Sequence, residues 1–122
     1  MAFVKNPVAG VLAANIGEDI NGNATAQANV LSGATTLYMV RIDNTANSAE
    51  TVYLKIYYAT SATVGTDRPA GIFACPASAS RQYSVPDGIT FSTGITYAVV
   101  KTAGLQGSSN PSGTVKVYLA TA

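Results

Sequence analysis

The chain has 122 residues, the length of one domain, and 48% of them are hydrophobic, which is enough to form one core. Only 11% are charged and the net charge is +1, whereas an ordinary soluble domain has roughly 25% charged residues. This balance excludes a domain that binds along the phosphate backbone of a nucleic acid. It also excludes a chain that repulsion between its own charges keeps disordered. A weakly charged surface has little electrostatic protection against association, which favours a protein that is covered in an assembly.

The first 26 residues are predicted to form an extended N-terminal arm. Pro7, Gly10, Gly17 and Gly22 interrupt this segment, and it shows neither helical nor strand periodicity. Its apolar side chains have no local structure in which to be buried, so we expect them to bind a neighbouring subunit or another protein. The arm residues expected to bind a partner are Phe3, Val4, Val8, Val11 and Leu12. The alternative is that the arm packs back on its own domain as an extra strand.

Residues 27–122 are predicted to form one all-β domain, because short β-branched and aromatic segments alternate with turn residues. Seven or eight strands are expected, seven of them at 27–31, 36–42, 52–58, 70–75, 81–85, 95–101 and 114–119. Strands at this spacing favour an antiparallel sandwich or a small barrel, and we predict a β-sandwich of jelly-roll or immunoglobulin-like topology. The residues expected in its core are Leu54, Ile56, Val99, Val117 and Leu119.

Three turn signals divide these strands. The polar stretch from Asp43 to Ser48 is predicted to close a hairpin. The loop from Val64 to Pro69 is predicted to be structured and to fix the crossing between the two sheets, with Gly65 supplying a backbone angle that other residues resist. Residues 86–88, Pro-Asp-Gly, predict a turn in which glycine accepts a positive φ.

The clearest strand carries two candidate binding residues. Val52, Leu54, Ile56 and Tyr58 point to one face of it, while Tyr53, Lys55 and Tyr57 point to the other. Exposed aromatic rings on a sheet can stack on sugars or contact a protein partner, so Tyr53 and Tyr57 are candidate partner-binding residues. The alternative is that both are covered by the second sheet, by the arm or by a neighbouring subunit.

No catalytic, cofactor or metal site is predicted. The chain has no histidine and a single cysteine, Cys75, so an imidazole base, a catalytic triad and a thiolate zinc site are all excluded. The stretch from Asp19 to Asn23 has the spelling of the start of a calcium loop, but the twelfth position is Val30 and not glutamate. No segment approaches the ~20 apolar residues that span a bilayer. We therefore expect neither an enzyme nor a nucleic-acid-binding or membrane protein.

Three segments between residues 50 and 100 form a more specific pattern. They are Tyr53-Leu-Lys-Ile-Tyr57, Thr63-Val-Gly-Thr-Asp-Arg-Pro69 and Pro86-Asp-Gly-Ile-Thr-Phe-Ser-Thr-Gly-Ile-Thr-Tyr-Ala98. This pattern resembles small virion proteins of tailed bacteriophages, in which a V-K-L-Y strand leads to a T-V-G-T-D-x-P loop. A later G-(I/L)-x-F-S-T-G-I-x-(Y/F)-A segment in those proteins leads into a core strand. The N-terminal arm is not covered by the resemblance.

The resemblance implies a β-sandwich on the virion, of the head decoration (cement) or related head–neck kind, and no catalytic residues. Such proteins are often trimeric and clamp the junctions between capsid subunits. We therefore expect a structural protein on the capsid surface that binds the major capsid protein as a homo-oligomer, preferably a homotrimer. Two alternatives stay open: a tail, neck or fibre component of the virion, and a carbohydrate-binding or adhesive module.

Overall fold

A computed structural model describes the backbone of residues 3–7 and 15–122, with the side chains of all of these except residues 4–7 and 29–32. This part of the chain forms nine strands and no helix, and so contains no helix that could cross a membrane. The strands are β1 (Phe3–Pro7), β2 (Asn15–Asp19), β3 (Gln27–Ser32), β4 (Thr35–Asp43), β5 (Val52–Tyr57), β6 (Gly71–Cys75), β7 (Ser80–Phe91), β8 (Gly94–Val100) and β9 (Lys116–Thr121).

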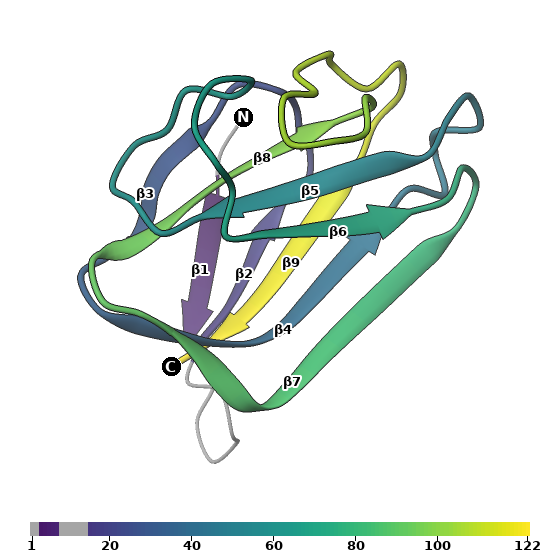
Figure 1. The fold of residues 1–122 in the computed structure, drawn as a ribbon. Coiled ribbons are helices and arrows are strands. Elements are labelled where there is room, and N and C mark those ends of the chain that lie inside the picture. Colours follow the sequence, from purple (N-terminus) through teal and green to yellow (C-terminus); the bar gives the residue numbers. More distant parts are fainter. Residues whose placement is uncertain (1–2, 8–14) are drawn as a thin grey trace.

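The strands form two antiparallel sheets that face each other (Figure 1). One sheet has the order β1-β2-β9-β4-β7, and the other has the order β3-β8-β5-β6. Strand pairs β2–β9, β3–β8, β4–β7 and β5–β6 are all neighbours, as they would be in one long hairpin rolled over itself. This order defines a jelly roll, so the predicted all-β sandwich is confirmed, with jelly-roll rather than immunoglobulin-like topology.

The core lies between the two sheets and comes from the alternation of apolar side chains along each strand. The five residues predicted in the core are each at most 1% exposed: Leu54, Ile56, Val99, Val117 and Leu119. Residues from the facing sheet, among them Leu37, Val40 and Ile42, complete this core. β8 is buried along its whole length, because a second layer of chain also covers its outer side.

All seven predicted strands are present, and β7 is much longer than predicted. β7 runs from Ser80 to Phe91 and pairs with β4 on both sides of a break in register, between Ser84 and Ile89. The Pro86-containing turn signal therefore forms a bulge inside a strand and does not separate two strands. Gly88 has a φ of 75°, and a Cβ there would lie 2.4 Å from a methyl carbon of Thr36, so the predicted positive φ is confirmed.

The described residues of the N-terminal segment do not form an arm that extends away from the domain. β1 pairs with β2, and β2 pairs with β9, so the described residues of this segment continue the five-stranded sheet. The ring of Phe3 lies across Gly17, where a Cβ would be 1.8 Å from a ring carbon, and it contacts Tyr97 at 6.0 Å between centroids. The strand alternative is the correct one here, because β9 supplies the hydrogen-bond partners that the segment lacks by itself.

The two loops on either side of β5 make the opposite connections to those predicted: the first crosses between the sheets, and the second joins neighbouring strands. Residues 44–51 join β4 of one sheet to β5 of the other, so this polar loop crosses between sheets and does not close a hairpin. The side-chain amide of Asn44 holds the crossing by donating to the carbonyls of Glu50 and Pro76 at 3.0 Å each.

The second loop, residues 58–70, joins β5 to its neighbour β6 within one sheet, so it does not fix a crossing. It is structured, as predicted. The amides of Thr66 and Asp67 donate to the Thr63 carbonyl, and the Thr63 amide donates to Oδ2 of Asp67 at 2.7 Å. Gly65 has a φ of 93°, which confirms the expected need for glycine.

Candidate functional site

The outer face of β5 is covered, which the alternating pattern does not reveal. Loop 101–115, between β8 and β9, lies over this face (Figure 1). Lys55 is 0% exposed, and its Nζ donates to the carbonyls of Leu105 at 3.0 Å and Gly107 at 2.6 Å. Burial lowers the pKa of Lys55. The lysine predicted to point outward thus fastens a loop to the sheet.

The two tyrosines predicted to bind a partner have different surroundings. Tyr53 is half-buried, whereas Tyr57 is only 1% exposed, so the interpretation of Tyr57 as an exposed stacking ring is wrong. The hydroxyl of Tyr57 is buried and has no hydrogen-bond partner. Burial, with a smaller contribution from the negative charge of Asp67, raises the pKa of Tyr57. A buried hydroxyl without a partner is uncommon in folded proteins and requires an explanation.

This unpartnered hydroxyl belongs to a residue that lines a partly open cavity of about 280 Å³ beneath loop 58–70. The other polar side chains of the lining are Ser61, Asp67 and Arg68, and apolar surface comes from Tyr58, Pro69 and three alanines. The volume lies close to the lower end of small-molecule sites, roughly 300 Å³. We call this cavity the loop pocket.

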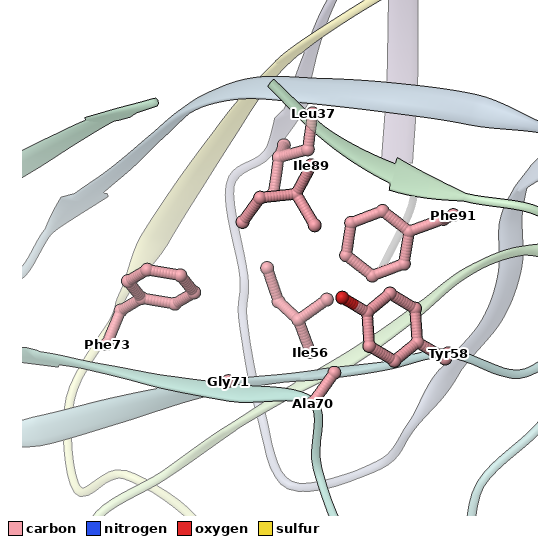
Figure 2. Close-up of a pocket in the computed structure, with 8 residues that line it drawn as sticks. All are labelled: Leu37, Ile56, Tyr58, Ala70, Gly71, Phe73, Ile89 and Phe91. Carbon is pink, nitrogen blue, oxygen red and sulfur yellow. The ribbon is translucent and has the colours of Figure 1, made fainter. Parts of the chain in front are cut away.

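A second, apolar pocket lies beside it in the opening between the two sheets. Figure 2 shows Leu37, Ile56, Phe73, Ile89 and Phe91 directed toward one another around this space. The cavity measures about 30 Å³, room for about two water molecules, so it is a notch in the packing and too small for a ligand.

Tyr58 lies between the two pockets and lines both of them. Its ring packs against Phe91 at 4.5 Å between centroids, yet the side chain is 57% exposed. It therefore presents an aromatic surface at the rim of the loop pocket. The alternating pattern predicted that Tyr58 would face the core, but β5 ends at Tyr57 and the chain turns away there.

The partner-binding residues predicted in the N-terminal segment do not form an exposed apolar stripe among the described side chains. Phe3 packs against the core of its own domain. Val4 lies in β1, and its side chain is outside the description. Val8, Val11 and Leu12 lie outside the described residues, so their expected contact with a partner stays a prediction.

The acid at the start of the calcium-like stretch is used inside the fold. Asp19 is 0% exposed and accepts hydrogen bonds from the Tyr97 hydroxyl and, at 2.9 Å, from the amide of Asn21. Burial, followed by the hydrogen bond to Asp19, raises the pKa of Tyr97. Within residues 3–7 and 15–122, no three His, Cys, Asp or Glu side chains lie close enough to hold a metal ion together.

Cys75 is a buried thiol in the core. Its Sγ lies 3.5 Å from the carbonyl of Ile42 and 3.4 Å from that of Ala79. Burial raises its pKa, which keeps the thiol neutral and unreactive. Cys75 is therefore a small apolar residue of the core.

The loop pocket cannot be predicted from the sequence, although two of its polar residues stand out there. Asp67 and Arg68 are adjacent opposite charges in a chain with only 13 charged residues, 7 basic and 6 acidic. They were interpreted as part of a structural loop, and Ser61 and Tyr58 carried no signal of their own. The loop pocket forms because the chain returns over the end of β5. No local pattern in the sequence shows this return.

Comparisons of this chain with protein-family models, with curated proteins and with solved structures give no match.

Proposed function

We propose that this protein is a structural component of a bacteriophage virion, a decoration protein that binds the outer surface of the capsid and stabilises it. Its partner in this proposal is the major capsid protein, and the chain acts as a homo-oligomer, preferably the homotrimer that the resemblance implies. The alternative within the same class is a tail, neck or fibre component.

The observation that carries the proposal is the free edge at β7. This strand is 12 residues long and stands at the end of its sheet, so one side of its backbone pairs with no strand among the described residues. A long free edge invites pairing with another chain, and monomeric proteins block such edges with charges, proline, bulges, short strands or covering loops. The bulge at Pro86 interrupts the edge of β7, but residues 80–84 before the bulge have Arg81 as their only charged residue. Coverage by a neighbouring subunit accounts for such an edge.

Two further features support the proposal. The low charge of the chain leaves its surface weakly protected against association. Segments 63–69 and 86–98, which carry the resemblance to phage virion proteins, also lie near each other in space: the residues that follow the first, Ala70 and Gly71, line the apolar notch together with Ile89 and Phe91. The end of the first of these segments therefore lies close to part of the second.

The proposal is tested by binding to capsids of the phage that encodes the chain, prepared without this protein. We expect the purified protein to sediment with these capsids at a fixed ratio to the capsid protein and to raise the temperature at which they rupture. Ser84→Lys places a charge on an exposed position of the β7 edge and should abolish binding. The matched control Ser109→Lys, on exposed loop 101–115, should bind normally.

Protein that stays in the supernatant with intact capsids would contradict the decoration proposal. Sedimentation with isolated tails in place of capsids would support the tail alternative. Equal binding by both lysine variants would show that the β7 edge is not the contact.

A further inference from the structure

We propose that the loop pocket is a binding site for one monosaccharide unit of a glycan. The proposal rests on the pocket alone and does not depend on whether the chain decorates a capsid. It assigns a ligand class to a cavity formed by Tyr57, Ser61, Asp67 and Arg68, with the ring of Tyr58 at its rim.

The size and the polarity of the pocket point to a small, polar ligand. Its volume of about 280 Å³ lies near the ~300 Å³ at which small-molecule sites begin, which suits one sugar ring and not a nucleotide or a peptide. Small-molecule sites combine apolar walls with a few polar groups that fix orientation. The apolar wall here comes from Pro69 and alanines, and the polar groups converge from both ends of loop 58–70.

The charges select a neutral ligand that can both donate and accept hydrogen bonds. Asp67 supplies a carboxylate, which disfavours a phosphate or another anion, and the adjacent Arg68 disfavours a cation. A sugar hydroxyl donates to a carboxylate and accepts from a guanidinium, so neighbouring hydroxyls of one ring can satisfy both groups. Oδ2 of Asp67 already accepts the amide of Thr63 at 2.7 Å, which holds the carboxylate in place.

Tyr57 provides the independent observation. Its hydroxyl is buried without a partner in a side chain that is 1% exposed, and a buried polar group without a hydrogen bond is destabilising. The hydroxyl is closed off from solvent in the unliganded chain, so a ligand hydroxyl supplies that partner only by entering between Asp67 and Tyr57. The exposed ring of Tyr58, 57% accessible, adds an amphipathic surface against which the apolar face of a sugar ring can pack.

The test is a titration of the ¹⁵N-labelled full chain with millimolar glucose, galactose, mannose, rhamnose and N-acetylglucosamine, followed by amide chemical shifts. We expect saturable shifts for at least one sugar, concentrated on the amides of residues 57–70. Asp67→Asn keeps the oxygen that accepts the Thr63 amide but removes the charge, and it should weaken binding by about tenfold. Tyr57→Phe should weaken it by about fivefold or more.

Two control variants test the location of the site. Tyr118→Phe removes a hydroxyl from β9, and Asp43→Asn removes a carboxylate from β4. Neither residue lines the loop pocket, so both variants should bind as the wild type does. Unchanged binding by Tyr57→Phe and Asp67→Asn would overturn the proposal. So would a panel in which no sugar moves these amides, which is the result expected if only water enters the pocket. Shifts caused by inorganic phosphate and not by sugars would replace the sugar site by an anion site.

Discussion

Lys55 and Tyr57 lie two residues apart on the same outer face of β5, and both are buried beneath loops, yet their polar groups differ. Beneath loop 101–115, the ammonium of Lys55 has two carbonyl partners. Beneath loop 58–70, the hydroxyl of Tyr57 has none. The first region is therefore a closed structural contact, while the second retains an unused hydrogen-bonding group beside a cavity. Burial of a polar group does not by itself indicate function. Whether the buried group has hydrogen-bond partners distinguishes a structural contact from a candidate binding site.

The largest expected effect is at Lys55. Lys55→Met keeps the length of the side chain but removes both charge-assisted hydrogen bonds, leaving the carbonyls of Leu105 and Gly107 without their donor. We expect the free energy of unfolding to fall by about 2–4 kcal/mol, measured by urea denaturation, with faster amide exchange in loop 101–115. The control Lys101→Met, at an exposed lysine, should cost less than about 0.5 kcal/mol. Equal urea midpoints for the two variants would contradict a structural role for Lys55.

A smaller loss is expected where the two covering loops meet. Gly65 has a φ of 93°, and a Cβ there would lie 3.2 Å from Cβ of Ser108 in the other loop. Gly65→Ala should lower the free energy of unfolding by about 1–2 kcal/mol, because alanine resists this backbone angle and the contact is tight. The control Gly33→Ala shares the positive φ, 79°, but meets no atom within 4 Å, so its smaller loss isolates the contribution of the contact. A Gly65→Ala protein as stable as the wild type would mean that the loops adjust independently.

The opposite sign is expected at Tyr57. Tyr57→Phe removes a buried hydroxyl that has no partner, so in the absence of ligand we expect the free energy of unfolding to rise by about 0.5–1 kcal/mol. The control Tyr83→Phe removes a hydroxyl that donates to the carbonyl of Ala74, and it should lose about 1 kcal/mol. Destabilisation by Tyr57→Phe of the same size as by Tyr83→Phe would show that the Tyr57 hydroxyl is already satisfied in solution.

The smallest expected effect is on the pH dependence of stability, and it too has opposite signs at the two residues. The pKa of Lys55 is lowered by burial, so the unfolded chain binds more protons between the folded pKa and about 10.4, and stability rises with pH there. The pKa of Tyr57 is raised, so its contribution is complete below the unfolded value of about 10 and is lost as pH rises through the folded pKa.

Urea midpoints between neutral and strongly alkaline pH check these signs. The increase with pH should be smaller in Lys55→Met, and the loss at the alkaline end should be smaller in Tyr57→Phe. Identical profiles of urea midpoint against pH for the wild type and both variants would mean that burial shifts the pKa of neither group.

The sequence was sufficient to predict the strands that bury one face. Val52, Leu54 and Ile56 alternate strictly, and the structure places all three in the core. The alternation could not show what covers the other face. It predicted that Lys55 and Tyr57 would point outward, which is correct for their direction, but loop 101–115 and loop 58–70 bury them. A loop of glycine, serine and asparagine carries no periodic signal that says which surface it will cover.

The N-terminal strands were predicted only as the alternative to a partner-bound arm, for a related reason. Gly17 looks like a breaker in the sequence, but in the structure its missing side chain makes room for the ring of Phe3. β2 is a strand because β9 offers a free edge for it, not because its residues alternate. The loop topology was missed likewise, since the stretch 43–48 looks the same whether it closes a hairpin or crosses between sheets. The pocket at Tyr57 depends on such long-range placement and was therefore not predictable.

The central claim, that the chain is a structural part of the virion, is tested most directly by an electron cryomicroscopy reconstruction of the intact phage. The account predicts density for this jelly roll on the outer surface of the capsid, as a homo-oligomer around capsid subunit junctions and with the β7 edge against a neighbouring chain. A reconstruction at side-chain resolution that contains no copy of this chain in head, neck, tail or fibres would contradict the claim.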